Sequence, residues 1–168
     1  MHITYYILLN TYEVKKKLVS VLLHNIRSMH NVGSVFRTSD GAGVSKIYLT
    51  GYTPCPPRKE IYKTALGAEE VIPWEYHPDP LPLLKRLKKE GIEVVALEKN
   101  QNSKNIQDFH SNHSVCMILG NEIEGVNEEL LQLSDVVLHI PMHGKKESLN
   151  VSVAFGVGIY SLTQKKSR

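Results

Sequence analysis

The stretch that decides the fold is residues 16–51, "KKLVSVLLHNIRSMHNVGSVFRTSDGAGVSKIYLTG". Its first part, residues 16–26, has a continuous apolar centre, which is typical of a strand buried on both faces. Residues 31–43 predict a helix, and residues 45–51 predict a second strand. A strand, a helix and another strand in this order are the repeating unit of an α/β domain.

The same alternation continues to the end of the chain. The proline-rich "TPCPPR" at 53–58 predicts an irregular loop, because proline removes a donor and restricts its neighbour. Further helices are predicted at residues 59–70, 79–91, 127–134 and 148–162, and further strands at 71–76, 92–98, 114–120 and 135–142. Leu83, Leu84 and Leu87 make the apolar stripe of the second of these helices, and Gly91 ends it. The pattern predicts an α/β fold, a mainly parallel sheet flanked by helices on both faces.

Composition sets broad limits. The 168 residues fit one domain, and 42% hydrophobic with 22% charged residues is ordinary globular composition. A net charge of +3 is compatible with a nucleic-acid partner without requiring one. Cys55 and Cys116 form no metal-ligand spacing, so we expect reduced thiols and no metal site. No apolar stretch approaches the roughly 20 residues of a membrane span, and the start lacks a basic signal-peptide region. We therefore expect a cytoplasmic protein with no membrane partner.

Three polar, glycine-bearing loops follow predicted strands: "HNIRSMHNVG" at 24–33, "LGNEIEGVN" at 119–127 and "IPMHGKKESLN" at 140–150. In open α/β sheets, ligands bind outside the carboxyl ends of the strands, so the three loops predict one shared site. An ordinary dinucleotide fold would show G-x-G-x-x-G after its first strand. Nothing of that form follows "VSVLLHN", which disfavours the ordinary nucleotide-binding alternative.

Together these loops resemble the three motifs of the SpoU (TrmH-type) branch of the SPOUT RNA methyltransferases. "NIRSMHNVGSVFRTSDGAGV" is similar to the first motif, "ILGNEIEGV" to the second and "IPMHGKKESLNVSVAFGVGIY" to the third. The resemblance runs from about residue 20 to 163, and the motifs stand in the family's order. It implies a trefoil knot near the carboxyl end, S-adenosyl-L-methionine (AdoMet) held in that knot, and a homodimer.

The first motif also has a physical interpretation. Asn31 is a predicted N-cap, and an inward stripe follows it, made of Val32, Val35 and Phe36. Gly33, Arg37 and Asp40 share another face. Because helical side chains lean toward the helix N-terminus, we expect Arg37 to lean over Gly33, where no side chain obstructs a phosphate. The alternative is an Arg37–Asp40 surface pair at i, i+3.

The resemblance assigns further residues to the site. It implies catalytic roles for Arg37, Asn31, Glu122, Ser148 and Asn150, and cofactor contacts through Leu97, Gly120, Ile140 and Leu149. The residues themselves suggest that Ser148 caps the last helix and that Gly120 allows close backbone approach to a ligand. For Glu124 and for Lys145 with Lys146, a solvated loop stays an equal or stronger alternative.

The implied activity is methylation of a ribose 2′-hydroxyl in tRNA or rRNA, with tRNA favoured and no DNA partner expected. Arginine stays charged, so we expect Arg37 to stabilise the alkoxide rather than accept its proton, which leaves through phosphate, water or Glu122. The alternatives are an inactive RNA-binding module on the same fold and an RNA base methyltransferase. We expect one domain over residues 1–168, with residues 1–16 an extension and no separate RNA-binding domain. The apolar face of the last helix packs either within the chain or across subunits; it comprises Leu149, Val153, Val157 and Tyr160.

Overall fold

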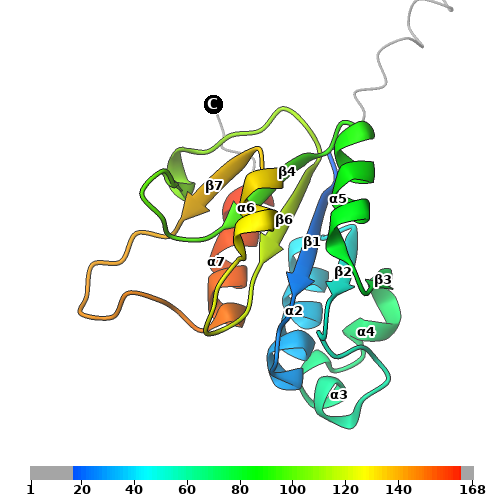
Figure 1. Cartoon of the computed structure of the whole chain (residues 1–168). Coiled ribbons are helices and arrows are strands. Elements are labelled where there is room, and N and C mark those ends of the chain that lie inside the picture. The colour runs from blue at the N-terminus through cyan, green and yellow to red at the C-terminus, as the bar shows by residue number, and fades with distance from the viewer. Residues whose placement is uncertain (1–16, 164–168) are drawn as a thin grey trace, which may run out of the picture.

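The computed structural model describes residues 17–163, and the predicted extension at 1–16 lies outside them. The described chain forms a sheet of order β3-β2-β1-β6-β4-β7-β5, in which every pair of neighbours is parallel (Figure 1). The strands are β1 (Val19–His24), β2 (Lys46–Thr50), β3 (Trp74–His77), β4 (Glu93–Leu97), β5 (Lys104–Asn105), β6 (Val115–Leu119) and β7 (Val136–His139). All the predicted strands are confirmed. The two-residue β5 was not predicted.

Helices cover both faces of the sheet, as predicted (Figure 1). The first face carries α2 (Met29–Ala42), α3 (Lys59–Ala65), α4 (Ala68–Val71) and α7 (Val151–Thr163), and the second carries α5 (Pro80–Lys89) and α6 (Glu128–Leu133). A short 3-10 turn, Ile106–Asp108, follows β5. Within residues 17–163 there is no helix with the length and apolar character to cross a bilayer.

The central strand β1 shows why the fold forms. Val21 and Leu23 face the core beneath α2, α3 and α7, while Leu22 faces the core beneath α5 and α6, and all three are fully buried. Since neighbouring residues of a strand point to opposite faces, only a continuous apolar run satisfies both cores. The predicted apolar stripe of α5, Leu83 with Leu84 and Leu87, is likewise buried.

The start of α2 corrects one prediction. The helix begins at Met29, and its N-cap is Ser28, whose side chain accepts a hydrogen bond from the Asn31 backbone N–H at 3.3 Å. The predicted N-cap at Asn31 is therefore wrong. The helix starts earlier because the Glu122 carboxylate takes the backbone N–H groups of Arg27 and Ser28, which orients these amides before the first turn.

Gly33 also corrects the sequence-based interpretation. It is buried, and a Cβ placed on it would lie 2.1 Å from Thr64 Oγ1 and 2.3 Å from the Ile61 carbonyl oxygen. The space beside this glycine is therefore filled by α3 and is not open to a ligand. Gly33 is required because two helices approach closely there.

The start of α7 gives a third correction. The helix begins at Val151, and Asn150 fills the cap position: its carbonyl accepts from the Ala154 N–H at 2.8 Å and its Oδ1 from the Ser152 N–H at 2.9 Å. Ser148 lies two residues further out and does not cap this helix.

Candidate functional site

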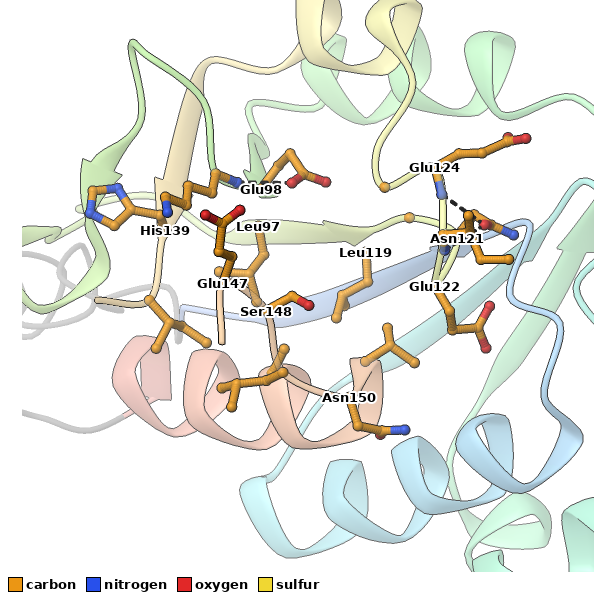
Figure 2. Close-up of a pocket in the computed structure, with 18 of the residues that line it drawn as sticks. Leu97, Glu98, Leu119, Asn121, Glu122, Glu124, His139, Glu147, Ser148 and Asn150 are labelled. Carbon is orange, nitrogen blue, oxygen red and sulfur yellow. Dashed lines mark hydrogen bonds between the residues drawn. The ribbon is translucent and has the colours of Figure 1, made fainter. Parts of the chain in front are cut away.

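A cavity of about 330 Å³ lies at the carboxyl ends of β4, β6 and β7, beside the start of α7 (Figure 2). Leu97 comes from the end of β4, Gly120 from the loop after β6 and Ile140 from the loop after β7. Leu149 comes from the segment just before α7. The structure thus brings together all four residues predicted to contact the cofactor. It does so because parallel strands end at the same edge.

Gly120 owes its place to packing within the cavity wall. A Cβ on Gly120 would lie 2.1 Å from the Gly125 carbonyl oxygen and 2.3 Å from the Val126 nitrogen. The loop after β6 therefore folds back on its own backbone, with an isolated bridge between Asn121 and Gly125. Close backbone approach was predicted at this glycine, but the partner is this returning loop.

Asn121, which the sequence analysis did not single out, holds that loop. Its side chain is buried, and its Oδ1 accepts hydrogen bonds from the backbone N–H groups of Ile123 at 2.8 Å and Glu124 at 3.0 Å. Its Nδ2 donates to the Asn25 carbonyl at 2.9 Å and to the Tyr52 hydroxyl at 2.8 Å. An Asn that follows a buried strand and precedes a glycine-bearing loop is a typical turn residue, so the sequence pattern could have predicted this role for Asn121.

Glu98 is a second residue that was missed. Its Oε2 accepts from the Val126 N–H at 2.9 Å, and its Oε1 accepts from the Lys99 N–H at 2.9 Å. The carboxylate therefore fastens the loop after β6 to the end of β4, on the wall of the cavity. No local pattern around Glu98 predicts this, because its partner lies 28 residues away along the chain.

Glu122 points from the cavity rim toward the start of α2 (Figure 2). Its carboxylate accepts three hydrogen bonds, from Arg27 N at 3.0 Å, Ser28 N at 3.2 Å and Asn31 Nδ2 at 3.1 Å. Burial raises the pKa of the Glu122 carboxyl, but the hydrogen bonds from Arg27, Asn31 and Ser28 outweigh that effect and leave the pKa below its ordinary value. A carboxylate with a lowered pKa and three donors is a weak proton acceptor at neutral pH.

Asn31 and Asn150 extend this network to the third motif. Asn150 Nδ2 donates to Asn31 Oδ1 at 3.3 Å, and Asn150 Oδ1 accepts from both the N–H and the hydroxyl of Ser152. One hydrogen-bonded chain thus runs from Glu122 through Asn31 to Asn150, joining segments 91 and 119 residues apart. Ser148 lines the cavity without belonging to this chain.

Two predicted site residues, Asn31 and Arg37, do not line the cavity; Asn31 hydrogen-bonds to two residues that do, whereas Arg37 hydrogen-bonds to none of them. Arg37 is exposed on α2 and is absent from the cavity lining. No ion pair joins it to Asp40, so the surface-pair alternative is wrong. Among residues 17–163 its guanidinium has no hydrogen-bonding or ion-pairing partner. A fixed positive charge is therefore displayed on the outer face of α2.

No group of three or more His, Cys, Asp or Glu side chains within the described residues has the arrangement of a metal site. Both cysteines are free thiols, and burial raises the pKa of Cys116 to about 12, which keeps it protonated.

Residues 18–160 match the SpoU rRNA Methylase family. The chain belongs to this family. Membership excludes the ordinary dinucleotide-binding alternative, and the SpoU/SPOUT fold predicted from the three motifs is confirmed.

Two curated relatives of this SpoU chain illustrate its similarities. It is 29% identical over 155 residues to the tRNA (guanosine(18)-2′-O)-methyltransferase of Aquifex aeolicus, covering 92% of the chain and 72% of the relative. It is 32% identical over 142 residues to the 23S rRNA (guanosine(2553)-2′-O)-methyltransferase of Bacillus subtilis, covering 84% of the chain and 56% of the relative.

A solved structure supports the same assignment. The AdoMet-bound rRNA methyltransferase of Sinorhizobium meliloti superposes with a TM-score of 0.79 at 27% sequence identity. The match covers 86% of this chain and 55% of that one. The SpoU chain therefore spans only about half the length of this structural relative, and what the whole relative does is no direct finding about the shorter chain.

The last helix of the SpoU domain exposes an apolar stripe. The stripe residues are 38% to 52% exposed and comprise Leu149, Val153, Val157 and Tyr160. These side chains are only partly covered within the chain, so the structure leaves both alternatives open. Gly41 of α2 lies beside the stripe, since a Cβ there would be 3.3 Å from the Tyr160 hydroxyl. Arg37 precedes Gly41 by four residues, so the arginine borders the stripe.

Proposed function

We propose that this chain is an AdoMet-dependent methyltransferase acting on a ribose 2′-hydroxyl of RNA. The observation that carries the proposal is the hydrogen-bonded chain Glu122–Asn31–Asn150, which joins the first motif to the cavity that the second and third motif loops line. The relatives named above are tRNA and rRNA 2′-O-methyltransferases, which supports the same reaction class.

The cavity fits AdoMet in size and chemistry. Its volume of about 330 Å³ lies within the usual range for small-molecule sites. Leu97, Ile140 and Leu149 offer apolar surface to an adenosyl group, and the carboxylates of Glu98, Glu124 and Glu147 on the wall suit a ligand with a positive charge. When bound, AdoMet supplies an electrophilic methyl group on a sulfonium.

The chain's own task is to make the ribose hydroxyl a better nucleophile. Arg37 presents a permanent positive charge that holds a neighbouring phosphate and stabilises the developing alkoxide. Glu122 is a poor candidate for the proton acceptor, because three donors already engage it and its pKa is lowered. The proton therefore passes to a phosphate oxygen or to water, and Glu122 serves to position α2 and Asn31.

A homodimer completes the proposal. The α7 stripe is an exposed apolar surface of the kind that marks protein interfaces. Pairing two chains through it would bring Arg37, which borders the stripe, to the boundary between subunits. Light scattering is expected to give twice the mass of one chain. We also retain the trefoil knot and a single SPOUT domain as parts of this proposal.

The substrate is a structured RNA, and we favour tRNA over rRNA. The decisive experiment transfers a tritiated methyl group from AdoMet onto total RNA and identifies the methylated nucleoside by mass spectrometry. A 2′-O-methylnucleoside in tRNA is the expected product. A base-methylated nucleoside would contradict ribose methylation and support the base-methyltransferase alternative. RNA binding without any methyl transfer would favour the inactive binding module.

A further inference from the structure

We infer that the exposed rings of Tyr52 and Tyr76 form a stacking platform for unpaired bases of the RNA substrate. The platform occupies the carboxyl ends of β2 and β3, next to the site but outside its cavity. The inference rests on the proposed function for its substrate class. It adds a binding surface and a recognition chemistry, base stacking beside the target nucleotide.

The Tyr52 ring is exposed yet fixed in place. The side chain is 57% exposed, although both its ends are held. Its hydroxyl accepts the hydrogen bond from Asn121 Nδ2 at 2.8 Å, and its backbone N–H donates to Asn25 Oδ1 at 3.1 Å. The ring therefore spans from the end of β2 past the end of β1 to the loop after β6. Since Asn121 lines the cavity, the platform reaches the site directly.

Tyr76 is held in a similar way on the edge strand β3. It is 47% exposed, and its hydroxyl donates to the Gly51 carbonyl oxygen at 2.8 Å. Gly51 is the residue next to Tyr52, so the two tyrosines meet at this one glycine. Gly51 in turn donates its N–H to the His77 carbonyl at 3.3 Å, which ties the end of β2 to the end of β3. Two fixed aromatic rings thus follow one another along the edge of the sheet.

The charge around the platform suits a polyanion. Arg27, in the loop after β1, is exposed. The Glu122 carboxylate is already engaged by the backbone N–H groups of Arg27 and Ser28. Sequence-specific RNA recognition uses unpaired bases stacked on aromatic rings, with arginines on the phosphates.

Fixing the rings increases what stacking contributes. A tyrosine that is already immobilised by its hydroxyl loses little rotamer freedom when a base lies on it. Tyr62 on α3 is a natural contrast, because it is 58% exposed while its hydroxyl has no hydrogen-bond partner among residues 17–163. An apolar protein partner would need only exposed rings, whereas base stacking favours rings that are both exposed and held.

The test compares Tyr52→Leu, Tyr76→Leu and Tyr52→Phe, with Tyr62→Leu as the control of matched exposure. Filter binding to bulk tRNA from cells that lack this protein measures RNA affinity, and calorimetry measures AdoMet affinity. We expect Tyr52→Leu to raise the Kd for RNA about tenfold and Tyr76→Leu to raise it about threefold. Tyr52→Phe keeps the ring but loses the hydrogen bond from Asn121 that holds it, so we expect an intermediate rise of about threefold. Tyr62→Leu is expected to stay within about twofold, with AdoMet affinity unchanged throughout.

The outcomes separate this inference from the proposed function. If the wild-type protein methylates RNA but Tyr52→Leu binds RNA like wild type, the platform is wrong and the proposed function stands. If the wild type transfers no methyl group, the proposed activity is wrong. The RNA affinities of the tyrosine variants still test whether the platform binds RNA. Ultraviolet cross-linking of bulk tRNA gives an independent result: the platform requires cross-linked peptides containing Tyr52 or Tyr76, and cross-links confined to other peptides overturn it.

Discussion

The two halves of the sheet's carboxyl edge differ in shape and chemistry. The loops after β4, β6 and β7 enclose a cavity lined by apolar side chains and backbone. Those after β1, β2 and β3 enclose no part of that cavity and instead display aromatic rings and arginines. A cavity suits a small ligand and an exposed aromatic, basic surface suits a polymer, so one edge serves two partners. The two halves meet at Asn121 and Glu122, which hydrogen-bond across the boundary.

The largest effect is expected from damage to the cavity half alone. Gly120→Val places side-chain carbons where the Gly125 and Val126 backbone now lies, and backbone cannot rotate away. We expect AdoMet binding to be lost in calorimetry, while filter binding still detects RNA. Gly144→Ala is the control, since a Cβ there meets nothing within 4 Å. If Gly120→Val lost both AdoMet binding and RNA binding, the two halves of the edge would not act independently.

The next effect concerns the charge on α2. Arg37→Lys keeps the positive charge but loses the planar fork that binds a phosphate in two places. We expect kcat for RNA methylation to fall about 100-fold, as when one alkoxide-stabilising donor is removed. AdoMet affinity should remain that of wild type, because Arg37 does not line the cavity. Full activity in single-turnover assays would remove Arg37 from the mechanism.

A third test concerns the support of the RNA-facing half. Gly33→Ala forces a methyl group against the Ile61 carbonyl and Thr64 of α3, so the two helices must separate. We expect the free energy of unfolding to fall by about 2 kcal/mol, measured by urea denaturation. Gly156→Ala is the matched control on α7, where the nearest atom to a Cβ is 3.9 Å away. Equal stability of the two variants would contradict the close α2–α3 contact.

The smallest effect is expected at the boundary itself. Glu122→Gln removes the charge that accepts the backbone N–H groups of Arg27 and Ser28 just before α2, and we expect the free energy of unfolding to fall by about 1 kcal/mol for this partly exposed group. Because the folded pKa of Glu122 lies below its ordinary value of 4.5, its stabilisation is present above about pH 4.5 and is lost as pH falls through the folded pKa. Chemical denaturation at pH 7 and at successively lower pH should therefore show a difference that shrinks as the pH falls below about 4.5. If the difference in free energy of unfolding between wild type and Glu122→Gln stayed the same at every pH, the effect would come from packing and not from the charge.

Much of the fold was predictable because it depends on local patterns. The continuous apolar run of β1 and the leucine stripe of α5 each report burial directly. The cofactor-facing residues were predictable only through the motif resemblance, since nothing in the spacing of Leu97 and Ile140 indicates a shared cavity. That the three loops share one site was predictable because the carboxyl ends of parallel strands lie at the same edge of the sheet.

The errors share a physical cause, which is contact between distant segments. Serine and asparagine are both good N-caps, and the choice of Ser28 over Asn31 depends on a carboxylate 94 residues away. The burial of Gly33 depends on α3, and its interpretation as open space ignored that helix. Local propensity cannot distinguish such cases, because the deciding atom belongs to another part of the chain.

The pairing of β1 with β6 has a consequence for how the protein acquires its site. Strands β1 to β3 come from residues 19–77 and strands β4 to β7 from residues 93–139, so each half of the sheet is local in sequence. The halves join only where Val19 pairs with Val115 and its neighbours follow in register. Closing a loop of that length is slow compared with forming either half. The Glu122 contacts span this seam, so a kinetic intermediate with two folded halves lacks the hydrogen-bonded link between the cavity and α2. Methyl transfer to RNA should therefore appear only in the last folding phase.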